Sequence, residues 1–280
     1  MRELHVFKCI NILKLVSSSL LGRLKNLVKL DVYQCFKLVH VFEEHVDAEV
    51  SLSKLKEIVL DSLSNTTHIW KDGPHQFISL CNLEKLCVYC CPKLRKLLSP
   101  KLLQGPVRLK YLDVIACHSL EVLLGHEEEQ DTEMAVPFLR SLTRVSVYGS
   151  PFFEKLECLN VSQCYKLQNV IEDKKGKQEA ASVEFPCLSS ISLFQLYRLK
   201  SFCTGYYTIE WPSLERLDIR YCSEMETFGS GDQVTPQLKK IVKHESEGQE
   251  TVITINGGDL NHVVQNHFGP KATTSEVGPS

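Results

Sequence analysis

The sequence is poor in the features that identify most functional classes. It has no apolar run near the roughly 18 residues that a membrane-spanning helix needs. The segment after Met1 has no basic stretch followed by an apolar one, so no secretory signal is visible. Neither charge is in excess, with 32 basic and 34 acidic residues among 280. This balance excludes a basic nucleic-acid clamp and an acidic disordered chain as descriptions of the whole protein.

Motifs for catalysis and for nucleotide binding are also missing. No G-x-x-x-x-G-K-[ST] phosphate loop occurs, so nothing in the chain is expected to cradle ATP phosphates. No G-x-S-x-G nucleophile elbow indicates a hydrolase. Cys87, Cys90 and Cys91 contain one C-x-x-C, but a zinc site needs further ligands at suitable spacing. We therefore expect no enzymatic activity, no cofactor and no metal site.

Leucine, in contrast, is abundant, with 39 residues, and it recurs in a repeated frame. The frame is L-x-x-L-x-V/I-x-x-C-x-x-L/M-x-x-apolar. Five copies are clear: "LVKLDVYQCFKLVHVF" from Leu27, "LEKLCVYCCPKLRKLL" from Leu83, "LKYLDVIACHSLEVLL" from Leu109, "LECLNVSQCYKLQNVI" from Leu156 and "LERLDIRYCSEMETFG" from Leu214. A partial copy opens the chain, and three more keep the frame without the Cys.

The frame predicts one short strand per copy. In L-x-V the two apolar side chains point the same way, because side chains alternate along a strand. A single strand cannot bury that face, whereas stacked copies bury it together. The period is close to that of leucine-rich repeats, so we expect an α/β leucine-rich-repeat solenoid with parallel strands on its concave face and irregular or helical turns outside. The second apolar positions are Val6, Val32, Leu60, Val88, Val114, Val147, Val161, Leu193 and Ile219.

The cysteines fit the same frame. Six of the twelve occupy the position that turns inward after the strand, where leucine-rich repeats place Asn or Cys: Cys9, Cys35, Cys91, Cys117, Cys164 and Cys222. Small buried thiols suit such a column. Because the chain is large and shows no export signal, we expect all twelve to be reduced thiols in a cytoplasmic protein.

Several stretches depart from the frame. Val147 and Val161 are only 14 residues apart, too short for a full repeat, while polar inserts at 125–137 and 172–186 lengthen two other copies. Thr251–Ile255 alternates like a strand that caps the end of the core. We expect a solenoid of nine to ten repeats over residues 1–244, a capping segment over 245–268 and a disordered tail over 269–280. Met1 falls just before a strand, which suggests a fragment of a longer protein.

Particular motifs point to one family of leucine-rich repeats. "CPKLRKLL" (Cys91–Leu98), "FPCLSSISLFQLYRLKSFCTG" (Phe185–Gly205), "WPSLERLDIRYCSEMETF" (Trp211–Phe228) and "GDLNHVVQ" (Gly258–Gln265) alternate Cys-containing and aromatic copies. They resemble the C-terminal repeats of plant coiled-coil, nucleotide-binding, leucine-rich-repeat (NLR) disease-resistance proteins. The resemblance covers about residues 1–268.

The resemblance implies a protein-recognition module for plant defence. In such a receptor the repeats sense a pathogen effector, or a host protein that effectors modify, and help to hold the nucleotide-binding domain inactive. No nucleic-acid partner is implied. The alternative is a substrate adaptor of an F-box-type ubiquitin ligase, whose repeats also carry Cys in this column. Those repeats follow the Cys with C-x-x-I-T-D, whereas "CPKL", "CFKL" and "CYKL" occur here.

The candidate binding residues follow the second apolar position of each strand. They are predicted to form an outward column with aromatic side chains at intervals of ~4.8 Å, as protein-binding hot spots use. The competing interpretation is that aromatic residues simply suit strands. A neighbouring outward column contains Asp31, Asp113 and Asp218, which could meet a basic partner or be solvated. The candidate binding residues are Phe7, Tyr33, Tyr89, Tyr148, Phe194 and Arg220.

Overall fold

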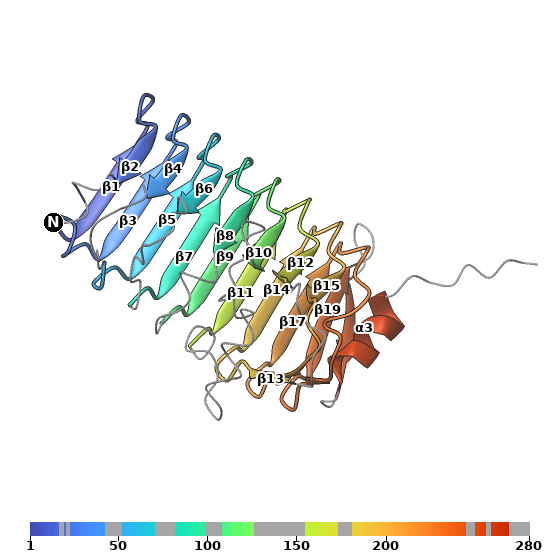
Figure 1. Ribbon diagram of the computed structural model, residues 1–280. Helices are drawn as coiled ribbons and strands as arrows, with labels where there is room; N and C mark the ends of the chain where they lie inside the picture. Colours follow the sequence, from blue (N-terminus) through green and yellow to red (C-terminus); the bar gives the residue numbers. More distant parts are fainter. Residues whose placement is uncertain are drawn as a thin grey trace, which may run out of the picture.

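The protein is a row of stacked coils, each contributing one strand to a long parallel sheet (Figure 1). The computed structural model describes residues 1–16, 20, 23–42, 52–70, 82–98, 108–125, 155–172, 181–244, 250–255 and 259–268. Within these residues no helix is long and apolar enough to cross a membrane. The predicted leucine-rich-repeat solenoid is confirmed.

The ten-stranded sheet carries the predicted strands. It is parallel from β1 to β19, and β20 pairs antiparallel with β19. The second apolar position of every frame lies in the same register, so that Val32 pairs with Val6 on one side and with Leu60 on the other. In sheet order the strands are β1 (Glu3–Phe7), β3 (Lys29–Tyr33), β5 (Glu57–Asp61), β7 (Lys85–Tyr89), β9 (Tyr111–Ile115), β11 (Cys158–Ser162), β14 (Ser190–Phe194), β17 (Arg216–Arg220), β19 (Lys240–His244) and β20 (Glu250–Thr254).

The segments after the turns form further strands rather than helices. Seven of them make a second parallel sheet, and three more make a small sheet in the last coils. The second sheet contains β2 (Lys14–Val16), β4 (His40–Phe42), β6 (His68–Trp70), β8 (Lys96–Leu98), β10 (Val122–Gly125), β12 (Asn169–Glu172) and β15 (Ser201–Cys203). The third contains β13 (Ala181–Glu184), β16 (Tyr207–Glu210) and β18 (Gln233–Val234).

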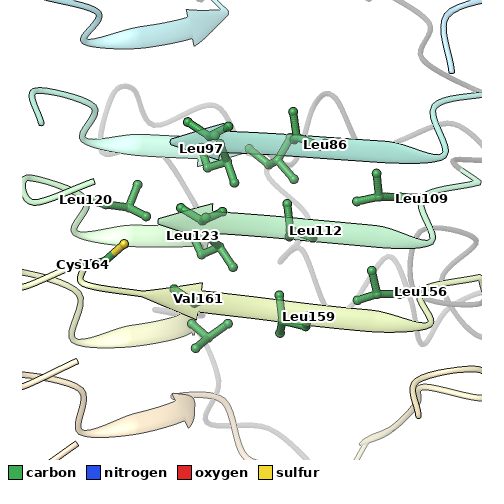
Figure 2. Packing of buried hydrophobic residues seen from close by; sticks show 14 of the residues in the cluster. Leu86, Leu97, Leu109, Leu112, Leu120, Leu123, Leu156, Leu159, Val161 and Cys164 are labelled. Atoms are coloured by element: carbon green, nitrogen blue, oxygen red, sulfur yellow. The ribbon is translucent and has the colours of Figure 1, made fainter. Parts of the chain in front are cut away.

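The core lies between these sheets and runs the length of the stack. Leu86, Leu112 and Leu159 occupy the same strand position in consecutive coils and are all buried, as Figure 2 shows. Leu97 and Leu123 meet them from the second sheet side of the core. Burial of this continuous leucine column, at roughly 25 cal/mol per Å² of apolar surface, stabilises each coil through its neighbours.

The cysteine column is buried as predicted, except at the first coil. Cys35, Cys91, Cys117, Cys164 and Cys222 are buried, whereas Cys9 is half-buried. Each thiol donates to the carbonyl oxygen two residues earlier, as in the 3.3 Å contact from Cys91 Sγ to Tyr89 O. Burial raises the pKa of the Cys222 thiol to about 12. These residues therefore act as small core side chains with one satisfied donor.

Each turn after a main strand begins with a residue in the left-handed region. Eight such residues have φ between 50° and 57°, and none is glycine: Lys8, Gln34, Ser62, Cys90, Ala116, Gln163, Gln195 and Tyr221. The amide of Gln34 donates to the carbonyl of Asp61 in the next coil (2.9 Å), and Ala116 donates to Ser162 in the same way (3.0 Å). The left-handed corner thus turns the chain inward and bonds it to the following coil.

One sequence expectation about strand order is wrong. A strand around Val147 was expected between those of Val114 and Val161, but β9 pairs directly with β11, and Val114 lies opposite Val161. Residues 126–154, including Val147, lie outside the described part of the chain. The frame periodicity could not reveal this, because a sequence copy of the frame does not fix which strands pair.

The C-terminal end is covered by β20 and by the helix α3 (Leu260–Phe268). Leu260 and Val264 of the helix are buried in the core. Asn261 fastens the helix to the last coil: its Oδ1 accepts from the amides of Phe228 (2.9 Å) and Gly229 (3.1 Å), and its Nδ2 donates to the carbonyls of Gly229 and Gly231 (both 2.9 Å). Asp259 Oδ1 accepts from the Asn261 amide, as an N-cap residue does.

Candidate protein-recognition surface

The predicted outward column exists on the ten-stranded sheet. Its residues pair in register from one strand to the next, so their side chains share one face. Phe7 is 59% exposed, whereas Tyr33, Tyr89 and Phe194 are half-buried by their neighbours. The column reads Phe7, Tyr33, Asp61, Tyr89, Ile115, Ser162, Phe194 and Arg220.

The aromatic residues of this column are not contiguous. Asp61 separates Tyr33 from Tyr89, while Ile115 and Ser162 separate Tyr89 from Phe194. Tyr148, the sixth candidate, lies outside the described residues, and the direct pairing of Ile115 with Ser162 leaves no position for it between those two strands. The structure therefore brings the remaining candidates into one column as separate aromatic positions.

Tyr89 is half-buried and forms a hydrogen bond to the neighbouring column. Its hydroxyl donates to Asp113 Oδ2 at 2.6 Å, and Asn160 Nδ2 donates to Asp113 Oδ1 at 2.9 Å. Burial, reinforced by the bond to Asp113, raises the pKa of Tyr89 well above its usual value. The phenol therefore stays protonated, and its ring is held in one orientation before any partner arrives.

The acidic residues of the neighbouring column are engaged within the protein. Asp31 Oδ2 lies 2.9 Å from His5 Nδ1 and 3.3 Å from Lys29 Nζ. Asp218 accepts from Arg220 Nη2 at 2.6 Å. Full solvation is wrong for Asp31 and Asp218, because both side chains are buried, whereas contact with a basic partner stays a prediction. The same bond fixes the candidate residue Arg220.

Two aromatic residues of the column contact side chains of neighbouring turns. The Phe194 ring packs edge-on against Tyr221, with centroids 5.7 Å apart. Lys8 Nζ lies 4.9 Å from the centroid of the Phe7 ring, a cation–π contact. The sheet face consequently presents oriented aromatic rings among internally paired charges, which suits a protein partner better than a diffuse charged ligand.

A second group of aromatic side chains, missed from the sequence, lies at the turns. His118, Tyr165 and Tyr197 each follow the inward residue of their coil and are exposed. The rings of His118 and Tyr165 stack with centroids 4.6 Å apart and planes 8° apart, and Tyr197 continues the row at 5.6 Å from Tyr165. The sequence signal was available in "CHSL", "CYKL" and "LYRL", where the residue after the inward position is aromatic three times in succession.

Stacked coils, a buried leucine and cysteine ladder, and an outward aromatic column define a leucine-rich-repeat solenoid, a protein-interaction fold. A family profile described as "Plant disease resistance protein RPS2-like, leucine-rich repeats" matches residues 1–118. Residues 1–118 are thus similar to the leucine-rich repeats of plant disease-resistance proteins, and the resemblance noted in the sequence is confirmed over this stretch. No curated protein and no solved structure gives a significant match to the chain.

Proposed function

We propose that the chain is the recognition module of a plant intracellular immune receptor that acts in the cytoplasm. In this role it senses a pathogen effector, or a host protein that an effector has modified. The single observation that best supports the proposal is the outward column of oriented aromatic residues on a solenoid of the disease-resistance type. Rigid aromatic side chains flanked by satisfied polar groups are typical binding hot spots.

The proposal includes a second contact within the receptor. The same module restrains the nucleotide-binding domain until the recognised protein binds, so that the two contacts are coupled. The chain itself is proposed to have no enzymatic activity, cofactor or metal ion, since its work is binding. The proposed protein-binding residues of the column are Phe7, Tyr33, Tyr89, Phe194 and Arg220.

The test begins with proximity labelling by the full receptor polypeptide in plant cells and then measures affinity for the labelled partner. Tyr89→Ala and Phe194→Ala should each weaken binding by on the order of 1 kcal/mol or more, about fivefold. Tyr111→Ala is the matched control, because Tyr111 is exposed on the same face at the other end of β9. Circular dichroism would verify that each variant is folded.

The outcome decides which surface recognises the partner. Unchanged affinity in both column variants would place recognition elsewhere, and the proposed role of the column would be rejected. Tyr89→Phe separates the ring from the hydroxyl, because it keeps the aromatic surface and loses only the bond to Asp113. We expect it to lose less affinity than Tyr89→Ala.

A further inference from the structure

The exposed aromatic row at the turns forms a surface separate from the sheet column. We define the turn ridge as His118, Tyr165, Lys166, Tyr197 and Arg198. The ridge spans the turns that follow β9, β11 and β14, which Figure 1 shows within a row of similar loops along one edge of the stack. Tyr165 is 38% and Tyr197 is 42% exposed, large values for rings that already contact each other. These rings are on the surface because the preceding inward residues, Cys164 and Leu196, fill the core.

The ridge carries positive charge without acidic residues in its turns. Residues 116–120, 163–168 and 195–200 contain Lys166, Arg198 and Lys200 but no Asp or Glu. No ion pair among the described residues involves these three cations. On the sheet face, in contrast, Lys29, Arg216 and Arg220 all contact carboxylates. The ridge therefore has charge available for a ligand.

The polar groups of the rings are also available. No hydrogen bond within the described chain uses the hydroxyl of Tyr165 or Tyr197. The imidazole of His118 is oriented by a 2.9 Å contact from Nδ1 to the Gln163 carbonyl, which requires a proton on Nδ1. The hydrogen bond to Gln163 and the stack on Tyr165 together fix the orientation of the His118 ring. Binding to a row of rings that is already ordered loses little side-chain entropy.

We propose that the turn ridge binds an acidic segment of a partner protein in an extended conformation. Carboxylates are the groups that two neighbouring cations and two phenol donors recognise when, as in the described part of this chain, they have no internal acidic partner. Adjacent coils lie ~4.8 Å apart and an extended chain rises ~3.3 Å per residue, so three or four residues cross the ridge. The rings supply apolar contact beneath the acidic side chains, as Tyr and Arg do at interface hot spots.

A single-stranded nucleic acid fits the ridge less well. Its bases bind by stacking on the faces of aromatic side chains. In the ridge, His118 and Tyr165 stack on each other at 4.6 Å, which occupies the faces between them. The phosphates would then contact only the cations, and the nucleic acid would not prefer the turn ridge to other lysine-containing parts of the edge. Nucleic acid is therefore an outcome that the experiment must distinguish.

The test uses the whole chain and fluorescein-labelled hexaglutamate, with binding followed by fluorescence anisotropy. We expect saturable binding that the double variant K166E/R198E weakens at least tenfold and Y165A/Y197A at least fivefold. The matched control is Lys93→Glu, which lies at the same turn position after Pro92, without a ring row, and whose Nζ donates to Asn65. It should change affinity less than twofold.

Three results would overturn the proposal: no saturable hexaglutamate binding, an equal loss of affinity in Lys93→Glu, or tighter binding of a labelled oligouridylate that depends on the same residues. The second would indicate a diffuse positive field along the edge. Tyr89→Ala should leave hexaglutamate binding unchanged, because Tyr89 belongs to the sheet column. Failure of the turn ridge and failure of the proposed sheet-column function are thus measured separately.

Discussion

The first and last coils share one frame but fill it with different side chains. From β1 to β9 the described core consists mainly of leucine, isoleucine, valine and cysteine, with Val41, Ile69 and Leu97 on the second sheet and Phe42 as its buried ring. From β14 onward the corresponding positions carry rings. Phe185 stacks on Trp211 at 4.5 Å, and Phe202 stacks on Phe228 at 4.9 Å.

The difference shows that one coil design accommodates two kinds of core side chain. The two ring pairs meet edge to face, with Phe202 and Trp211 5.3 Å apart, so the aromatic residues form one buried cluster. The third sheet, β13 with β16 and β18, occurs only in these ring-containing coils among those described. These coils are not longer than the others: Ser190 pairs with Arg216 and Arg216 with Lys240, steps of 26 and 24 residues, whereas the steps between successive strands from β1 to β9 are 26 to 28 residues. The match to the disease-resistance repeats covers the aliphatic half, residues 1–118.

The largest expected effect is at the centre of the aromatic cluster. Trp211→Ala removes a completely buried ring that contacts three others, and should destabilise the protein by about 3–5 kcal/mol. Trp211→Phe should cost less, since it keeps one aromatic ring in the cluster, although it loses the 3.3 Å bond from Nε1 to Gln233 and leaves a small cavity. Denaturant unfolding of both variants would measure this. An equal loss in both would mean that the indole hydrogen bond, not ring packing, stabilises the ring-containing coils.

A comparable substitution in the aliphatic half sharpens the contrast. Leu86→Ala should cost about 2–5 kcal/mol, because Leu86 is fully buried between Ile58 and Leu112 of the adjacent coils. Lys85→Ala, its exposed neighbour on β7, should have almost no effect. The measurement is the urea midpoint of each variant. A midpoint that moves for Lys85 and not for Leu86 would contradict the strand register.

The third effect concerns the end of the aromatic half. Asn261→Ala should destabilise the C-terminal cap by about 1–3 kcal/mol, because backbone groups of Phe228, Gly229 and Gly231 lose their partner. Hydrogen exchange should accelerate in α3 and the last coil and remain unchanged around β3 and β5, since coils contact only their neighbours. Uniform acceleration along the stack would show that the two halves unfold as one unit.

The smallest effect tests the corner that both halves share. Ala116 has φ of 57°, a conformation that is costly for branched side chains. Ala116→Val should therefore destabilise by about 1 kcal/mol, whereas Ala116→Gly should be neutral or stabilising. Thermal unfolding of the two variants would compare them. If glycine destabilises as much as valine, the methyl group of Ala116 matters for packing more than its backbone angle does.

Much of this architecture follows from the sequence because burial is periodic. The frame predicted the two buried apolar positions of each strand and the residues that share the outward column, as the register from Val6 to Ile219 confirms, but not the burial of Asp31, Cys87 and Asp218 between those positions. The left-handed corners were not predictable, because no glycine marks them: Lys8, Gln34 and Ala116 have unrelated side chains. Their conformation is imposed by the bond to the next coil. The turn ridge was missed for a similar reason, since ring stacking arises only when coils are superposed.

The corner bond has a consequence for how such a chain can change in length. The bond from Gln34 to Asp61 and the bond from Ala116 to Ser162 are nearly equal, 2.9 and 3.0 Å, although the first joins residues 27 positions apart and the second 46. Each corner thus needs only a following coil whose strand ends at the matching position. The number of residues between the corner and that strand is not fixed by the bond. Whole coils can be duplicated or deleted, and segments inserted between them, while every other corner keeps its partner. The molecule is in this sense modular, and its recognition surfaces can be lengthened or shortened one coil at a time.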